Sequence, residues 1–132
     1  MISYTDSIKG ITANKLRGFF VGWPNPPSPE IHLRLLANSY KVVLAIDDKT
    51  DNVVGFITAI SDGVLSAYIP LLEVLPAYQG QGIGQELTRR MLEKLSGMYM
   101  VDLFCDKELQ LFYARFGMKP SNGMSIRNHE NI

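Results

Sequence analysis

This chain of 132 residues has one cysteine, no net charge and no long apolar run. The single cysteine, Cys105, excludes an intramolecular disulfide and fits a reducing compartment. Lysine plus arginine and aspartate plus glutamate number 13 each, so no overall charge attracts nucleic acid or a membrane surface. The first ten residues, MISYTDSIKG, lack the apolar core of a signal peptide, and no stretch approaches the roughly 18 apolar residues of a membrane helix. We therefore expect a cytoplasmic protein with no nucleic-acid or membrane partner.

Histidine is scarce as well, and neither copy has neighbours that would hold a metal ion. His32 is expected on a helix surface and His129 in a polar tail, so we expect no metal site. The length fits one compact domain over residues 1–132. Its oligomeric state stays open, with a homodimer as one option.

The N-terminal third predicts two helices separated by prolines. Apolar residues recur at helical spacing in 12–23, TANKLRGFFVGW, which predicts an amphipathic helix. The prolines of PNPPSPE end it, and Ser28 before Pro29 is a typical start for a second helix. Three apolar residues of that helix are expected to face inward: Ile31, Leu35 and Leu36.

The middle of the chain changes to the period of strands. YKVVLAI and VVGFITAI are β-branched runs joined by the polar turn DDKTDN, which predicts a hairpin. A third strand follows in VLSAYIPLLEVLP, with a bulge or local splay at Pro70, which cannot donate a ladder hydrogen bond.

The C-terminal half alternates helix and strand. A helix from Ile83 has an inward face of Ile83, Leu87, Met91 and Leu95 and stops at Gly97. YMVDLFC predicts a strand, and DKELQLFYARFG predicts a last helix with Leu109, Phe112 and Phe116 facing inward. The polar tail from Ser121 is expected to add one short strand. The predicted order β-α-α-β-β-β-α-β-α-β is that of a mixed α/β fold.

Three glycines within five positions, Gly80, Gly82 and Gly84, stand directly before the helix at 83. Glycines leave the backbone N–H groups uncovered, and the first turn of a helix has unpaired N–H donors at its positive end. No acidic residue lies between Val74 and Gln85, so the segment suits a phosphate group. A tight structural turn is the simpler explanation, but it rarely needs so many glycines.

Two common phosphate loops do not fit this segment. A P-loop needs lysine and then serine or threonine after its last glycine, where this chain has Gln85 and Glu86. The segment also lacks the third glycine of a dinucleotide-binding fingerprint, and the strands predicted ahead of it are antiparallel rather than parallel. Asp102 does lie at the spacing of the acid that binds the ribose in that fingerprint.

The segment resembles the pyrophosphate loop of the GNAT acetyltransferases, whose pattern is glutamine or arginine, two residues, glycine, one residue, and glycine or alanine. Here these positions are Gln79, Gly82 and Gly84. LLEVLPAY is similar to the family's fourth strand and LFYARFGM to its last helix, so the resemblance covers almost the whole chain. It implies a GNAT-like fold and transfer of acetyl from acetyl-CoA to a primary amine of a small molecule or a protein.

The resemblance also implies which residues bind the co-substrate and which act on it. The acetyl-CoA-binding residues would be Leu72, Glu73, Val74, Gln79, Gly80, Gln81, Gly82, Ile83, Gly84 and Gln85, with the N–H of Val74 facing the thioester oxygen. Tyr113 corresponds to the tyrosine that protonates the departing thiolate. Glu73 is the first candidate for the general base, and Asp106 and Tyr68 are weaker ones. Cys105 is expected to be an inert core residue.

Substrate choice is expected to lie in the connection between the first two helices. Trp23, Phe20 and Tyr68 are predicted to contribute an apolar wall for the acceptor, together with Phe19. Core packing explains the two phenylalanines equally well. Two rival functions stay open: a non-catalytic acyl-CoA-binding or sensor module, and another kind of nucleotide-binding domain.

Overall fold

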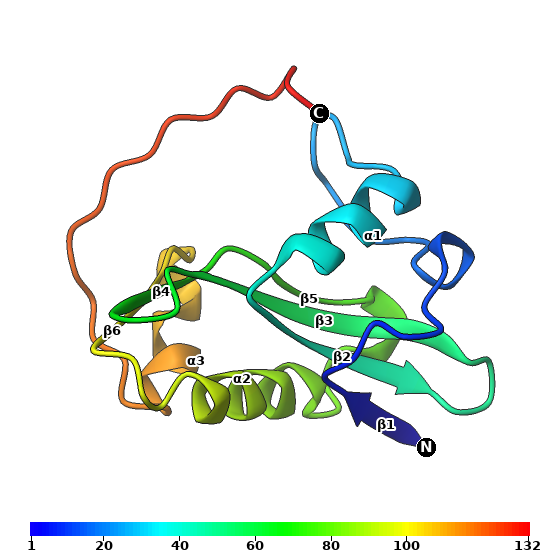
Figure 1. The fold of residues 1–132 in the computed structure, drawn as a ribbon, viewed down its shortest axis with the longest axis horizontal. Helices are drawn as coiled ribbons and strands as arrows, with labels where there is room; N and C mark the ends of the chain where they lie inside the picture. The colour runs from blue at the N-terminus through cyan, green and yellow to red at the C-terminus, as the bar shows by residue number, and fades with distance from the viewer.

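The computed structural model describes residues 1–132 as one six-stranded sheet with helices on both faces (Figure 1). The strands are β1 (Ile2–Thr5), β2 (Lys41–Asp47), β3 (Asn52–Ser61), β4 (Ser66–Ile69), β5 (Leu72–Val74) and β6 (Met100–Leu103). The α-helices are α1 (Pro29–Asn38), α2 (Ile83–Lys94) and α3 (Gln110–Ala114), and single 3₁₀ turns span Ala13–Lys15, Pro76–Tyr78 and Lys107–Leu109. The predicted mixed α/β class is confirmed.

The centre of the sheet is the predicted hairpin. β2 and β3 pair antiparallel, with Val43 opposite Ile57, and one register shift follows Ala45. Alternate residues of β2 point to opposite faces, so each face of the hairpin supports its own layer of core. β1 adds to the outer side of β2.

The strand after this hairpin is divided, as predicted, at Pro70. β4 pairs with the end of β3 through Ile60 and Tyr68, whereas β5 pairs with the middle of β3 through Phe56 and Glu73. β6 then pairs in parallel with β4 and makes no ladder with β5. The sheet is therefore open between β5 and β6.

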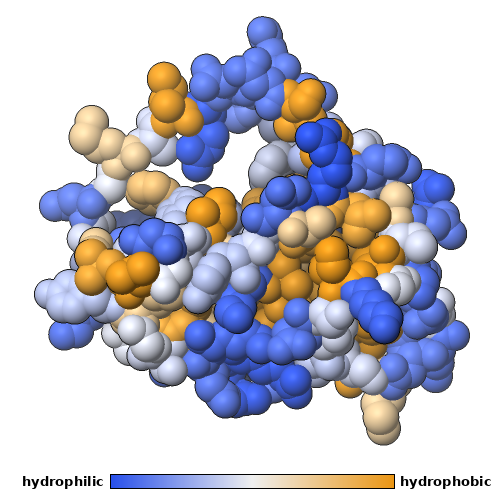
Figure 2. All heavy atoms as spheres, in the orientation of Figure 1, coloured by the Kyte–Doolittle hydropathy of each residue, from blue (hydrophilic) through white to orange (hydrophobic).

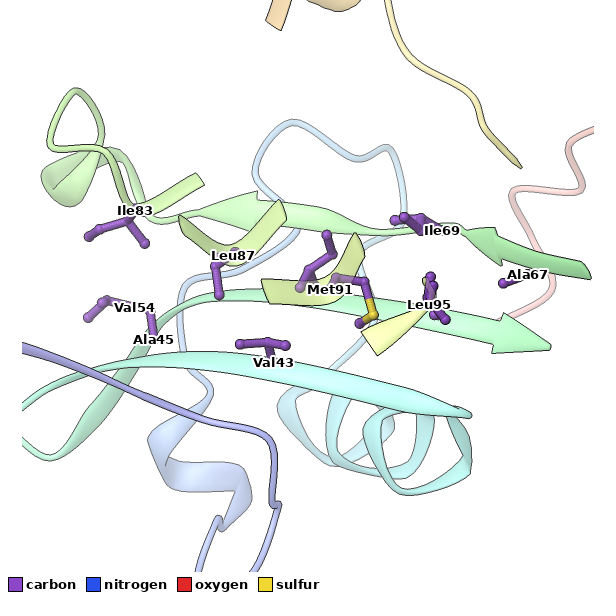
Figure 3. Packing of buried hydrophobic residues seen from close by; sticks show 11 residues of the cluster. Val43, Ala45, Val54, Ala67, Ile69, Ile83, Leu87, Met91 and Leu95 are labelled. Carbon is purple, nitrogen blue, oxygen red and sulfur yellow. The ribbon is translucent and has the colours of Figure 1, made fainter. Parts of the chain in front are cut away.

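Helix α2 covers one face of the sheet through the predicted stripe. Its four predicted residues are buried against Val43, Ala45, Val54 and Ile57 (Figure 3). Gly55 lets the helix approach closely, because a Cβ there would lie 3.1 Å from Leu87 Cδ1 and 3.2 Å from Ile83 Cγ2. The first residue of α2, Ile83, therefore packs directly against β3.

Helix α1 covers the other face, and it begins as predicted: the Ser28 side chain accepts a hydrogen bond from the Ile31 N–H, with Pro29 at the first position. Its buried residues are Leu36 and His32. The prediction that His32 lies on the surface is wrong. Its ring has no exposed area and packs 4.3 Å from the Phe56 ring, centroid to centroid.

The predicted helix over 12–23 is wrong. Only the turn Ala13–Lys15 is helical, because Gly18, Phe20 and Gly22 all have positive φ angles, 94°, 64° and 82°. The segment is a loop that still buries Leu16, Phe19 and Phe20 in the α1 layer. Apolar spacing alone did not distinguish a wrapped loop from a helix.

The C-terminal elements are shorter than predicted. The last helix starts with a 3₁₀ turn, which leaves Leu109 about half exposed and turns Tyr113 inward. Phe112 and Phe116 are half-buried. The expected strand after Ser121 is absent, and the tail instead runs in an extended arc away from the sheet (Figure 1). No helix has the length and apolarity needed to cross a membrane.

Candidate functional site

The glycine segment lies between the end of β5 and the first turn of α2. Gly80 and Gly82 adopt φ angles of 79° and 83°, a left-handed conformation that favours glycine. A Cβ on either residue would have no atom within 4 Å, so backbone conformation rather than lack of space requires glycine here. Gly82 is also the N-cap of α2, where no side chain caps the helix.

Six consecutive backbone N–H groups, those of residues 80–85, form no hydrogen bond within the chain. Bonding resumes at Glu86, whose N–H donates to the Gly82 carbonyl at 3.1 Å. Backbone donors normally find partners. A row of free donors at the positive end of a twelve-residue helix is an anion-binding arrangement.

The one acidic side chain in the first turn of α2 is neutralised by its own helix. Glu86 Oε2 accepts hydrogen bonds from Arg89 Nη2 at 2.7 Å and from Arg90 Nε at 2.6 Å. These bonds to Arg89 and Arg90 lower the pKa of Glu86 to about 2. Its charge is balanced locally and does not oppose an anion at the loop.

Strand β5 offers free backbone groups on its open side. The bonds from Leu75 N–H to Val54 and from Thr58 N–H to Leu71 set the alternation of the ladder. In an antiparallel pair successive residues bond alternately toward and away from the partner, so Val74 points its N–H away from β3, toward the gap before β6. Gln79 Nε2 donates to the Val74 carbonyl at 3.0 Å and ties the loop to this strand.

The loop, β5 and α3 converge at Gly84. A Cβ there would lie 3.8 Å from Val74 Cγ2 and 4.0 Å from Phe112 Cζ. The next residue, Tyr113, is 8% exposed, and its burial, with a smaller contribution from Cys105, raises the pKa of the phenol to about 12. Tyr113 therefore stays protonated at neutral pH and can donate a proton or a hydrogen bond.

A cavity of about 950 Å³ lies between β6, α3 and the start of the tail. Tyr113, Cys105 and Tyr68 line it, and the Tyr68 ring meets Phe104 edge-on at 6.0 Å. Cys105 is half-buried at this cavity, so the expectation of a core cysteine is wrong. Asp106 sits at the cap of the following turn, but its side chain makes no capping bond.

Glu73, the predicted general base, holds a loop. Its carboxylate accepts the Phe20 N–H at 2.8 Å and 3.0 Å, one distance to each oxygen, and the Val21 N–H at 3.3 Å. The strand that carries Val74 is thereby tied to the loop that was predicted to line the acceptor pocket. Sequence reasoning did not find this contact, because nothing local links residues 53 positions apart.

The predicted acceptor wall is divided between two places. Phe20 is 3% exposed in the core beneath Trp23, with the two ring centroids 5.0 Å apart, and Trp23 is 45% exposed. Tyr68 lies instead in the cavity beside Tyr113. The structure brings Glu73 and Phe20 together, but it does not bring Tyr68 into the Trp23 cluster. No three His, Cys, Asp or Glu side chains are placed to hold a metal ion.

Known proteins share both the sequence pattern and the fold of this chain. The model of the acetyltransferase (GNAT) family matches residues 9–118. A putative acetyltransferase from Deinococcus radiodurans R1 has a similar crystal structure, with a TM-score of 0.94 and 45% identity over 98% of this chain and 90% of that one. A GNAT family acetyltransferase from Streptococcus pneumoniae TIGR4 has a TM-score of 0.78 and 30% identity over 97% and 98%.

Among curated proteins, the chain is 34% identical over 100 residues to an uncharacterized N-acetyltransferase, ycf52-like, from Prochlorococcus marinus. The match covers 74% of this chain and 56% of that protein, so this chain spans little more than half of its relative's length. The family match covers most of the chain and includes the glycine loop, β5 and Tyr113. The chain belongs to the GNAT acetyltransferase family.

Proposed function

We propose that this protein is an N-acetyltransferase that moves the acetyl group of acetyl-CoA directly to a primary amine. The observation that carries the proposal is the row of free amides at residues 80–85, beside a strand whose Val74 N–H faces an open gap. Both features fit adjoining parts of acetyl-CoA: the diphosphate can accept several N–H bonds, and the pantetheine chain attached to it carries amides that can pair with β5.

The proposed roles follow from what each group can do. Residues 79–85 hold the diphosphate, and Leu72 to Val74 pair with the pantetheine. The Val74 N–H donates to the thioester oxygen as negative charge develops on it. Acetyl-CoA supplies an activated acyl group with a thiol as leaving group, so the amine forms the new C–N bond while the C–S bond breaks.

Proton transfers complete the exchange. Tyr113 gives its proton to the departing thiolate, since its raised pKa keeps it protonated at neutral pH. A carboxylate has about four acceptor positions. Glu73 uses three contacts to hold the loop of Phe20 and Val21. We assign its remaining capacity to a water molecule that takes the proton of the amine.

The acceptor is proposed to be a small molecule that enters near Trp23 or Tyr68. Trp23 is the exposed aromatic of the loop that Glu73 holds, and Tyr68 lines the cavity that contains Tyr113. Substitution of either residue by alanine should raise KM for the amine more than KM for acetyl-CoA.

A thermal-shift panel of CoA, acetyl-CoA, NAD and ATP tests the proposal. A ligand at 100 times its Kd stabilises the native state by about 2.7 kcal/mol, and for a chain of this size that raises Tm by about 10 °C. We expect this shift with CoA and acetyl-CoA. Stabilisation by NAD or ATP alone would identify another kind of nucleotide-binding protein.

Two variants of one glycine separate binding from folding. Gly82→Ala and Gly82→Glu both place a side chain at a positive φ, so each should cost about 1–2 kcal/mol of stability. Only Gly82→Glu adds a negative charge beside the diphosphate, so it should lose the CoA shift while Gly82→Ala keeps most of it. Release of CoA thiol in the presence of an amine panel then distinguishes an enzyme from a non-catalytic acyl-CoA-binding module.

A further inference from the structure

The first half of the row of free amides, residues 80–82, has few contacts that would hold it in place. Gly80, Gln81 and Gly82 are exposed, and a Cβ on either glycine would meet no atom within 4 Å. None of their N–H groups is bonded within the chain. An exposed turn of this kind takes its position from the residues on either side of it, so its two ends decide where the amides point.

The downstream end is held by helix α2. Ile83 is 3% exposed and packs against β3 at Gly55. The outer face of the helix is polar, with Arg89 and Glu93 exposed, and Figure 2 shows it as a hydrophilic band along the lower side of the molecule. The helix therefore has one buried face and a fixed orientation, and the last three amides of the row are fixed with it.

The upstream end is held by the side chain of Tyr78, the last residue of the turn Pro76–Tyr78. Its ring packs against the core cluster beneath α2, and its hydroxyl donates a hydrogen bond to Asp47 Oδ2 at 2.5 Å. Gln79, which stands between Tyr78 and the row, bonds through its side chain to the Val74 carbonyl, five residues back in the same segment. The Tyr78–Asp47 bond is therefore the last side-chain link between this end of the row and the centre of the sheet.

Asp47 is a fixed acceptor for that bond. It ends β2 and is paired on both sides, opposite Ile2 of β1 and Asn52 of β3. It is only 8% exposed, and its other carboxylate oxygen accepts the Lys49 N–H at 2.9 Å. The bond from Tyr78 is the main cause that lowers the pKa of the Asp47 carboxyl. Asp47 is therefore ionised at neutral pH, and a hydrogen bond to an ionised acceptor is strong.

The bond fixes a direction that packing would not. Apolar contact is non-directional, so it would hold the Tyr78 ring without fixing how the chain leaves it. Tyr78 and Gly80 are two residues apart, at most about 7 Å along the chain, so a rotation at Tyr78 carries the amides with it. The lengths of N–H···O bonds span only about 0.5 Å. A shift of the amides by about 1 Å would therefore break their bonds to a diphosphate.

We propose that Asp47 and Tyr78 are positioning residues for the co-substrate. Their hydrogen bond sets the angle at which the amides of residues 80–82 meet the amides of residues 83–85, so that both groups converge on one diphosphate. The inference rests on the proposed function, since it takes the row as the diphosphate site. Neither side chain contacts the ligand or the reacting atoms, so the pair acts on binding of CoA and not on the chemical step.

Tyr78→Phe tests the role, because it removes the hydroxyl and keeps the ring in the core. Calorimetric titration with CoA should give a Kd about tenfold higher than that of the parent chain, the equivalent of one hydrogen bond. At a CoA concentration of 100 times the parent Kd, the rise in Tm should fall to about half. With acetyl-CoA, KM should rise by a similar factor while kcat and KM for the amine stay within about twofold, as expected for lost binding that is uniform in ground and transition states.

Further variants separate positioning from a general loss of stability. Tyr40→Phe is the matched control: Tyr40 is 40% exposed just before β2, at the opposite end of that strand from Asp47, and its variant should keep the parent Kd. Asp47→Asn keeps an acceptor for the Tyr78 hydroxyl and should recover most of the affinity, whereas Asp47→Ala should match Tyr78→Phe. Both changes remove the same bond, so the double variant Asp47→Ala with Tyr78→Phe should bind CoA no more weakly than either single variant.

Hydrogen exchange locates the effect on the row. At saturating CoA, exchange of the amides of residues 80–85 should be slowed in the parent chain and slowed less in Tyr78→Phe. A parent chain that binds CoA, with the same Kd and the same protection of these amides in Tyr78→Phe, would overturn the positioning role and leave the proposed function standing. Additive losses in the double variant would overturn it as well. A parent chain that does not bind CoA would overturn both.

Discussion

Replacing Glu73 by alanine removes the one acceptor that holds the loop of Phe20 and Val21 to strand β5. The Phe20 N–H loses contacts of 2.8 and 3.0 Å to a charged carboxylate, and it belongs to a residue that is only 3% exposed. A hydrogen bond to a charged group contributes about 1.5–3 kcal/mol. The Val21 contact, 3.3 Å and exposed, adds little. We therefore expect Glu73→Ala to lower the free energy of unfolding by about 2 kcal/mol.

For this chain length, an unfolding entropy of about 2.1 cal/mol/K per residue converts that loss to a fall in Tm of about 7 °C. Circular dichroism melts at pH 7 measure it. The single tryptophan, Trp23, gives a local readout, because it packs on Phe20 and should become more accessible to acrylamide in the native state. Glu73→Gln is the matched control: it keeps one oxygen for the Phe20 N–H and should lose about half as much stability.

A Tm within 2 °C of the parent, with unchanged quenching, would refute the assignment of Glu73 as a loop anchor. The same two variants test its proposed second role. A proton acceptor needs the carboxylate itself, so Glu73→Gln should lose as much turnover as Glu73→Ala although it keeps more stability. If Glu73→Gln instead loses less turnover than Glu73→Ala, in proportion to its smaller loss of stability, Glu73 acts only by positioning the loop.

Three further predictions rest on separate features. Tyr113→Phe should slow turnover about 10²–10⁴-fold with unchanged affinity for acetyl-CoA, and no activity loss from Tyr113 ionisation should appear below about pH 10, since its pKa is near 12. Burial lowers the pKa of His32 to about 4. Between pH 6.5 and 4 the unfolded chain binds a proton at His32 that the folded chain does not, so the free energy of unfolding should fall by about 3 kcal/mol over this range. Urea titrations at several pH values should show a smaller fall for His32→Leu. Gly55→Ala should cost about 1–3 kcal/mol because its Cβ would press on Leu87 at 3.1 Å, whereas Gly84→Ala, with contacts of 3.8 Å and beyond, should be tolerated in thermal melts.

Local sequence signals predicted the elements whose pattern has one structural solution. The stripe of α2 and the β-branched hairpin each match a single period, and Ser28 before Pro29 marks a helix start by its own chemistry. The strand is divided at Pro70 because proline has no N–H to donate to the ladder. The free amides of the glycine loop were also predictable, because they depend only on the glycines and on the helix that follows them directly in sequence.

Long-range contacts account for what was missed. Apolar residues recur at helical spacing in 12–23, but Gly18 and Gly22 adopt positive φ angles, and the segment is a loop whose Phe20 N–H bonds to the distant Glu73 carboxylate. His32 is buried because the hairpin and that loop enclose it from both sides, and both ring nitrogens are left without hydrogen bonds. The predicted strand after Ser121 is absent because those residues form no ladder with any strand of the sheet, and pairing of that kind is not visible in the local sequence.

The division of the strand at Pro70 has a kinetic consequence. Because no ladder joins β5 to β6, the proposed pairing of the pantetheine chain of acetyl-CoA with Val74 requires no inter-strand hydrogen bond to break first. Association should therefore follow the simple second-order kinetics of a ready-made surface, with a rate proportional to ligand concentration and no plateau from a slow opening step. Stopped-flow traces that saturate with concentration would show that the gap has to form first.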